Sequence, residues 1–192
     1  PKVLVAAEGE AVRAVAALPQ KETCDTIIFG PKYSMAVFDQ AFLSGEGLED
    51  VLRKLAQDVV LFDQTACSSP QVVVLEKGAV SARRFAEALS RGFEALPTKL
   101  RRTQMPERQC LEVISARGTY LLSEDRDIVM PRDLGWTILI DREEGLPEPV
   151  QGRCVFVREV NDLNDVMAHI TRKVQTIALC IRDREKARAF AD

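Results

Sequence analysis

The transition from a helical segment to an apolar run within residues 48–75 is the feature that most constrains the fold. We predict a helix over residues 48–62, because apolar residues recur at helical spacing from Leu48 to Val59 and charged residues lie on the opposite side. Such a helix buries one face and leaves the other in water. Residues 72–75 are three valines and a leucine, a run typical of a buried strand. The two segments together predict a helix that lies on a sheet.

Strand-like and helix-like segments alternate along the rest of the chain. Short runs rich in β-branched residues predict strands at residues 3–7, 26–29, 35–38, 127–130, 136–140, 154–157 and 176–181. Amphipathic spacing predicts further helices at residues 11–18, 82–95 (capped by Ser81), 110–117, 163–170 and 184–191. We therefore predict an α/β fold with three layers, in which a mostly parallel sheet carries helices on both faces.

Length and charge exclude several classes of partner. A chain of 192 residues with 46% hydrophobic content is long enough to bury a sizeable core. Its net charge of -3 argues against nucleic acid or an anionic membrane surface as a partner, because both need a concentrated basic surface. No apolar stretch approaches the ~20 residues that a membrane-spanning helix requires, so we expect no membrane span.

The cysteines indicate a reduced protein without a structural metal. They are odd in number and widely spaced, and no two of them have the spacing of a zinc site. They are Cys24, Cys67, Cys110, Cys154 and Cys180. We expect neither disulfides nor a metal, and we predict a cytoplasmic location.

A polar loop at residues 63–71, with the sequence Asp-Gln-Thr-Ala-Cys-Ser-Ser-Pro-Gln, holds Cys67 between the long helix and the buried strand. Many free cysteines are small buried hydrophobes, and that interpretation stays open from the residue type alone. The polar neighbours on both sides are unusual for a core position, however. A thiol held in one place on a rigid scaffold is suited to act as a nucleophile.

This loop and an earlier segment carry a family resemblance. Residues 29–39, Phe-Gly-Pro-Lys-Tyr-Ser-Met-Ala-Val-Phe-Asp, together with the loop around Cys67, resemble the acyl-CoA reductases, which include the fatty-acid reductase of bacterial luminescence. These enzymes are members of the aldehyde dehydrogenase superfamily. The resemblance implies an aldehyde-dehydrogenase-like catalytic domain, in which Cys67 matches the nucleophile.

The reaction that this resemblance implies is reduction of a fatty acyl-CoA to an aldehyde. The Cys67 thiolate would attack the thioester, CoA would leave, and NADPH would deliver hydride to the acyl-enzyme. The family also implies acyl-activating protein partners and a homo-oligomeric full-length enzyme.

One departure from the superfamily agrees with this reaction. Hydrolytic aldehyde dehydrogenases have a glutamate, just before a Leu-Gly-Gly-Lys turn, that activates water. The matching position here is Ile28, ahead of the Phe-Gly-Pro-Lys turn. Without that base, water should attack the acyl-enzyme slowly.

The resemblance also implies cofactor contacts. Gly9 falls where the superfamily has its phosphate loop, Gly30 and Lys32 border the nicotinamide position, and Glu148 matches a ribose-binding glutamate. Each position also has a simpler interpretation. Gly9 lies between acidic residues in what can be an ordinary turn, Gly30 can serve only to turn the chain, and Glu148 can be a solvated loop carboxylate.

We predict two domain portions. Residues 1–28 are expected to be a remnant of a cofactor-binding domain, and residues 29–192 the catalytic, thioester-forming domain. The chain starts with Pro1 inside a predicted strand, so we expect it to be truncated at both ends of a longer enzyme. Because the superfamily places hydride transfer between two domains, we expect little reductase activity from this chain alone.

Two rival functions remain open from the sequence. The single histidine, His169, is a possible base for Cys67 in a thioester hydrolase, although a histidine on a helix surface is the simpler interpretation. The second rival is a non-catalytic binding or assembly module. A basic group consisting of Arg91, Lys99, Arg101 and Arg102 has two interpretations, a contact for CoA phosphates or a solvated face.

Overall fold

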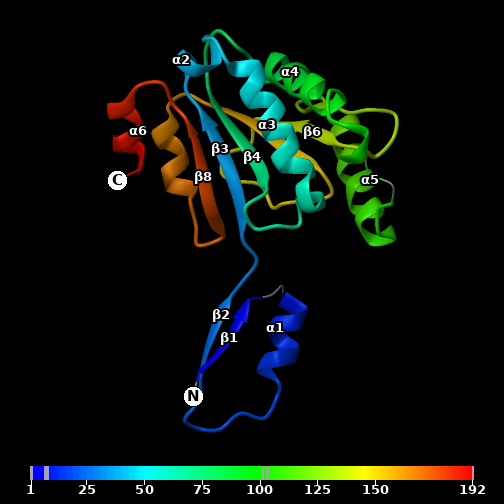
Figure 1. Cartoon of the computed structure of the whole chain (residues 1–192), viewed down its shortest axis with the longest axis vertical. Coiled ribbons are helices and arrows are strands. Elements are labelled where there is room, and N and C mark those ends of the chain that lie inside the picture. Colours follow the sequence, from blue (N-terminus) through cyan, green and yellow to red (C-terminus); the bar gives the residue numbers. More distant parts are fainter. Residues whose placement is uncertain (1, 7–8, 101, 103, 192) are drawn as a thin grey trace.

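A computed structural model describes residues 2–6, 9–100, 102 and 104–191. The main part of the chain is organised around one sheet with the strand order β5-β6-β7-β4-β3-β8 (Figure 1). The strands are β3 (Tyr33–Phe38), β4 (Pro70–Glu76), β5 (Asp127–Val129), β6 (Thr137–Ile140), β7 (Cys154–Val160) and β8 (Val174–Cys180). Only β5 runs antiparallel to its neighbour, so the predicted mostly parallel sheet is confirmed for the described residues.

One face of this sheet is covered by α3 (Leu48–Val60) and α4 (Ala82–Glu94). Leu52 of α3 and Phe85 of α4 are fully buried in one apolar cluster with Val73 and Leu75 of β4. The amphipathic pattern of each helix therefore points to the sheet, as predicted. The Ser81 hydroxyl accepts a hydrogen bond from the backbone N–H of Arg84, which confirms the predicted N-cap of α4.

The opposite face is covered by α5 (Glu107–Leu121), the 3-10 helix η3 (Leu163–His169) and α6 (Arg184–Ala191). A second apolar cluster joins side chains of these helices to Val72 and Val74 of β4. Successive β4 residues thus enter opposite clusters, which explains a continuous apolar run instead of an alternating one. The predicted three-layer α/β fold is confirmed.

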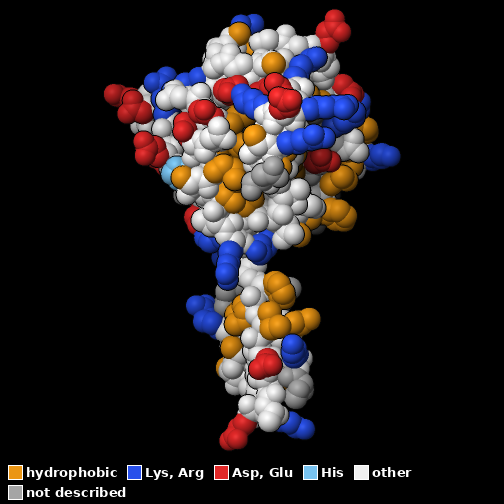
Figure 2. Space-filling view, turned by 90° about the vertical axis from the view of Figure 1, so that its left-hand side faces the viewer, with side chains coloured by type: hydrophobic (Ala, Val, Ile, Leu, Met, Phe, Trp, Pro, Cys, Tyr) orange, Lys and Arg blue, Asp and Glu red, His pale blue; other side chains and the backbone are white. Residues whose placement is uncertain are grey.

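A smaller unit precedes the main sheet. It consists of β1 (Lys2–Ala6) and β2 (Asp25–Phe29), paired in parallel, and α1 (Gly9–Ala16). Figure 1 shows it as a narrow extension, and Figure 2 shows apolar side chains on its surface. The two sheets are separated at residues 30–32, close to the predicted boundary between residues 28 and 29. That the small unit is part of a cofactor-binding domain remains a prediction.

Some elements differ from the expectation. The predicted helix 48–62 ends as an α-helix at Val60 and continues as the 3-10 turn η1 (Leu61–Gln64). The predicted helix 163–170 is the 3-10 helix η3, whereas the predicted helix 110–117 lies within the longer α5. Two short elements, α2 (Gln40–Leu43) and η2 (Thr98–Leu100), were not predicted. In the part of the chain that the structure describes, every helix is too short or too polar to cross a membrane.

Candidate active site

Cys67 lies in the short connection between η1 and the start of β4, and its side chain is exposed. Hydrogen bonds hold the backbone around it. The Ser34 hydroxyl of β3 donates to the Cys67 carbonyl oxygen at 2.8 Å, and the Ser69 N–H donates to the Ala66 carbonyl at 2.9 Å. The thiol is therefore accessible on a loop that is fixed to the central sheet.

Gln64 anchors the same loop from the interior. Its side chain is fully buried, and Nε2 donates to the carbonyl oxygens of Pro70 and Cys154, each at 2.7 Å. In return, Nε2 of Gln71 donates to the Gln64 carbonyl at 3.0 Å. Buried amides that bridge loop and strand in this way hold the entry to β4 in one conformation.

The chain enters the cysteine loop through an unusual backbone. Phe62, Asp63 and Gln64 have φ angles of 53°, 51° and 66°, all in the left-handed region. For residues other than glycine this conformation costs roughly 1–2 kcal/mol each. Such a run persists only where surrounding contacts over-determine it, and such places cluster at functional sites.

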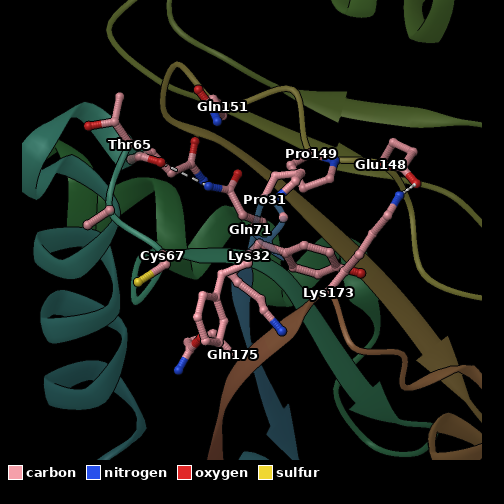
Figure 3. A pocket seen from close by; sticks show the side chains of 15 residues that line it. Pro31, Lys32, Thr65, Cys67, Gln71, Glu148, Pro149, Gln151, Lys173 and Gln175 are labelled. Carbon is pink, nitrogen blue, oxygen red and sulfur yellow. Dashed lines mark hydrogen bonds and ion pairs between the residues drawn. The ribbon is translucent and has the colours of Figure 1, made fainter. Parts of the chain in front are cut away.

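A cavity of about 670 Å³ opens beside Cys67 (Figure 3). Its walls come from segments that precede or begin four parallel strands: Lys32 before β3, Cys67 before β4, Gln151 before β7 and Gln175 at the start of β8. Because these strands are parallel, their amino ends meet at one edge of the sheet. The topology thus brings residues that are distant in the sequence together in one site.

The predicted site residues fall into two groups. Cys67, Gly30, Lys32 and Glu148 all line this cavity, and in Figure 3 Cys67 and Glu148 lie on opposite sides of it. Gly9 is the first residue of α1 in the small N-terminal unit. The predicted phosphate loop around Gly9 includes residues 7 and 8, which lie outside the described residues.

The charged groups of the cavity are partly paired. The Lys32 ammonium donates to the backbone carbonyl of Arg172, and the Lys173 ammonium forms an ion pair with the Glu148 carboxylate. The Glu148 side chain is 79% exposed. A carboxylate this exposed exchanges partners at little cost, because surface ion pairs contribute only about 0–1 kcal/mol.

The other cysteines differ from Cys67. All five lie in the described part of the chain, and Cys67 alone among them is exposed. Burial raises the pKa of Cys154 to about 11, and burial followed by the nearby Asp39 raises the pKa of Cys180 to about 11. Cys24 and Cys110 are half-buried. Cys67 is thus the thiol best placed to meet a substrate.

Comparison with known proteins agrees with this geometry. The family model described as Acyl-CoA reductase (LuxC) matches residues 3–192, nearly the whole chain. The chain belongs to this family. The long-chain acyl-protein thioester reductase of Vibrio harveyi is 27% identical over 178 residues, which cover 88% of this chain and 34% of that relative. The chain therefore spans about a third of the length of this curated relative.

Solved structures extend the similarity to the fold. Aldehyde dehydrogenase C of Pseudomonas syringae superposes with a TM-score of 0.75 at 11% identity, over 99% of this chain and 42% of that chain. The NADP-dependent glyceraldehyde-3-phosphate dehydrogenase of Bacillus halodurans C-125 gives 0.72 at 10% identity, over 99% and 41%. At such identities the likeness concerns the fold alone. The predicted family and the aldehyde-dehydrogenase-like fold are both confirmed.

The structure of this acyl-CoA reductase family member adds residues that the sequence did not single out. Tyr33, Gln64, Gln71, Lys173 and Gln175 also line the cavity. Burial, and then the Glu148 charge, raise the pKa of Tyr33. Gln64 and Gln71 stand within or beside the cysteine motif, so proximity in sequence was an available signal. No signal in the sequence pointed to Lys173 and Gln175, because only the pairing of β8 with β3 brings them to the cavity beside Cys67.

Other sequence hypotheses find no support in the site. His169 is exposed on η3 and does not line the cavity beside Cys67. Arg102 is not part of a solvated basic face, because its side chain is only 6% exposed and pairs with Asp63. Arg101 lies outside the described residues. Among the described residues, no group of three or more His, Cys, Asp or Glu side chains lies close enough to hold a metal ion.

Proposed function

We propose that this chain carries the acyl-accepting cysteine of an enzyme that reduces fatty acyl-CoA to an aldehyde with NADPH. The observation that carries the proposal is the exposed Cys67 thiol on a hydrogen-bonded loop, at the wall of a cavity that also holds Lys32 and Glu148. Membership of the acyl-CoA reductase family and the similarity to an acyl-protein thioester reductase support an acyl thioester as substrate.

The chemistry assigned to this chain is covalent capture of the acyl group. The Cys67 sulfur attacks the thioester carbonyl, a new carbon–sulfur bond forms, and the bond to the CoA sulfur breaks, so CoA leaves as a thiolate. Addition of hydride and a proton to the carbonyl, and loss of the Cys67 thiol, then release the aldehyde. We propose that backbone N–H groups of the Cys67 loop stabilise the oxyanion of the tetrahedral intermediate.

The cavity fits the nicotinamide half of a dinucleotide. A side chain added at Gly30 would meet no atom within 4 Å, so the wall is open there, and the exposed Glu148 carboxylate offers acceptors for ribose hydroxyls. Several similar structures were solved with NAD or NADP, which supports a nicotinamide cofactor for this chain. When bound, NADPH supplies the hydride. Gly9 is proposed to lie near its phosphates.

Water should compete poorly for the acyl group. The position that holds a water-activating glutamate in hydrolytic relatives is Ile28, which lies in β2. An aliphatic side chain cannot accept a proton, so the acyl-enzyme persists until hydride or CoA reaches it.

Intact mass measurement tests the proposal in the full-length protein. Incubation with a fatty acyl-CoA should add one acyl group, and the Cys67→Ala variant should add none. Cys110→Ala is the matched control and should be acylated like the wild type, because that half-buried thiol lies on α5. An adduct that persists in Cys67→Ala, or none in the wild type, would refute the function.

The remaining assignments of the whole enzyme are also proposals. We propose homo-oligomers, acyl-activating protein partners and a cytoplasmic location, the last supported by five free thiols. Little reductase activity is expected from residues 1–192 alone, because hydride transfer in this superfamily takes place between two domains.

A further inference from the structure

Two buried arginines converge on one carboxylate oxygen at the start of the cysteine loop. Asp63 Oδ1 accepts from Arg102, at 3.2 Å from Nε and 3.1 Å from Nη2. The same oxygen lies 2.8 Å from Nε and 2.7 Å from Nη2 of Arg153. The arginine side chains are only 6% and 8% exposed. Guanidinium groups removed from water to this extent depend on their carboxylate partner.

Each arginine also holds the segment that carries the other. Arg102 Nη1 donates to the Gly152 carbonyl at 3.2 Å, and Arg153 Nη1 donates to the Leu100 carbonyl at 2.9 Å. The cluster of Asp63, Arg102 and Arg153, called here the Asp63 clamp, therefore joins three segments that are distant in sequence.

The clamp connects two strained stretches of backbone. Asp63 belongs to the left-handed run at residues 62–64, and Arg153 ends a second run at residues 151–153, with φ angles of 61°, 66° and 64°. Gln64 Nε2, which donates to the Cys154 carbonyl at 2.7 Å, joins the same two stretches. Strained backbone of this kind is retained where the surrounding structure imposes it, and it often serves a site.

Both stretches lead directly into opposite walls of the cavity. Cys67 follows Asp63 by four residues, and the lining residues Glu148 and Gln151 shortly precede Arg153. A shift of the clamp would therefore move the nucleophile relative to the loop with Glu148. A displacement of about 1 Å at a nucleophile can lower a rate about 100-fold.

We propose that Asp63 is a positioning residue, which fixes the Cys67 thiol relative to the Glu148 loop through its paired contacts with Arg102 and Arg153. This inference rests on the proposed acyl transfer to Cys67. It assigns a function to the first residue of the Asp-Gln-Thr-Ala-Cys segment, which does not itself line the cavity.

The decisive variant in the full-length protein is Asp63→Asn, which keeps the side-chain shape and removes the charge. We expect acylation of Cys67 at saturating acyl-CoA to slow about 10- to 100-fold, while the acyl-CoA concentration at half-maximal rate changes less than about threefold. Asp63→Glu restores the carboxylate and should recover part of the rate.

The matched control is Asp50→Asn. The Asp50 carboxylate also pairs with two cations, Arg53 and Lys54, each at 2.6 Å. Its side chain is about as exposed as that of Asp63, 50% against 46%, but its cationic partners are 53% and 64% exposed, whereas the arginines of the Asp63 clamp are buried. Removal of the Asp50 charge should change acylation less than about twofold, because exposed pairs contribute little.

Alkylation by iodoacetamide separates failure of this inference from failure of the proposed function, since it needs no acyl substrate. We expect the Cys67 alkylation rate to change at least about threefold in Asp63→Asn, with Cys110 unchanged as internal reference. A wild-type protein that forms no acyl adduct refutes the acyl-transfer function. In that case, the Cys67 alkylation rates of the wild type and of Asp63→Asn still decide whether Asp63 positions the thiol.

A second variant covers the case in which Asp63→Asn does not fold. Arg102→Gln leaves one carboxylate facing one arginine, so no buried charge loses its partner, yet the tie to Gly152 is lost. A several-fold loss of acylation in a folded protein supports the inference. Folded Asp63→Asn or Arg102→Gln protein with acylation and Cys67 alkylation within about twofold of wild type would overturn it.

Discussion

Cys67 and Cys154 carry the same thiol in opposite environments. Cys67 is exposed on the loop before β4, whereas Cys154 is completely buried at the start of β7, where burial raises its pKa to about 11. Because the thiolate is the reactive form, the burial and the raised pKa of Cys154 both lower its reactivity. The difference provides a test at the scale of single residues.

We expect iodoacetamide to modify Cys67 first and Cys154 and Cys180 last in the folded chain. With a pKa of about 11, only about one in a thousand of the Cys154 and Cys180 thiols is a thiolate near pH 8. The thiolate fraction of Cys180 grows as the pH rises toward its pKa, so its lag should shrink at high pH. Peptide mass spectrometry over time measures the order.

In denaturant the five thiols should react at similar rates, which controls for local sequence effects. Modification of Cys154 ahead of Cys67 in the folded chain would contradict the assignment of Cys67 as the accessible thiol.

At the scale of elements, α3 and α4 approach each other closely at Gly92. A Cβ atom at this position would lie 3.0 Å from the Leu52 carbonyl oxygen and 3.4 Å from the Ala56 Cβ. Gly118 also lies inside a helix, α5, but a Cβ there would meet no atom within 4 Å. The two glycines have the same intrinsic helix propensity and different surroundings.

Alanine at these two positions should therefore have opposite effects on stability. Gly92→Ala pushes α3 away from α4 and should lower the free energy of unfolding by about 1–3 kcal/mol, because overpacking outweighs the gain in helix propensity. Gly118→Ala should raise it by about 0.5–1 kcal/mol, since alanine loses less backbone entropy. Urea unfolding of the two variants measures both, and shifts of the same sign would disprove the close packing at Gly92.

In the whole molecule, the strands of the two sheets differ in how deeply they are buried. In the central β4, all residues from Pro70 to Leu75 are buried, between neighbours β3 and β7. In β2, which among the described residues pairs with β1 alone, every residue is exposed or half-buried. Isolated two-stranded sheets are marginally stable in water, so local opening should begin in the small unit.

Hydrogen exchange of the chain tests this order. Backbone amides of β2 should exchange faster than those of β4 by about two orders of magnitude or more, because β4 opens only with the main core. Amides of β3, the fully buried strand between β4 and β8, should be protected like those of β4. Equal protection of β2 and β4 would show that the two sheets form a single cooperative unit.

Local residue patterns were enough to predict the main elements and the candidate nucleophile. Val72 to Leu75 predicted β4, because a strand covered on both faces requires an uninterrupted apolar run. Ser81 marked the start of α4, since its hydroxyl satisfies a backbone N–H that the helix leaves free. The polar neighbours of Cys67 likewise indicated an exposed loop. Each of these patterns involves residues that are close together in the chain, so the sequence alone is enough to recognise it.

Tertiary structure alone decided the rest of the site. The left-handed run at residues 62–64 contains no glycine, the residue that usually marks such a conformation in a sequence. The spacing of apolar residues in η3 did not distinguish a 3-10 helix from an α-helix. The neighbours of Cys67 and Asp63 come from residues 30–33, 100, 102, 148–153 and 173–175. Sheet order, which does not follow sequence order, brings the amino ends of β3, β4, β7 and β8 to one edge. Such contacts depend on how distant elements pack, and no local pattern of residues encodes that packing.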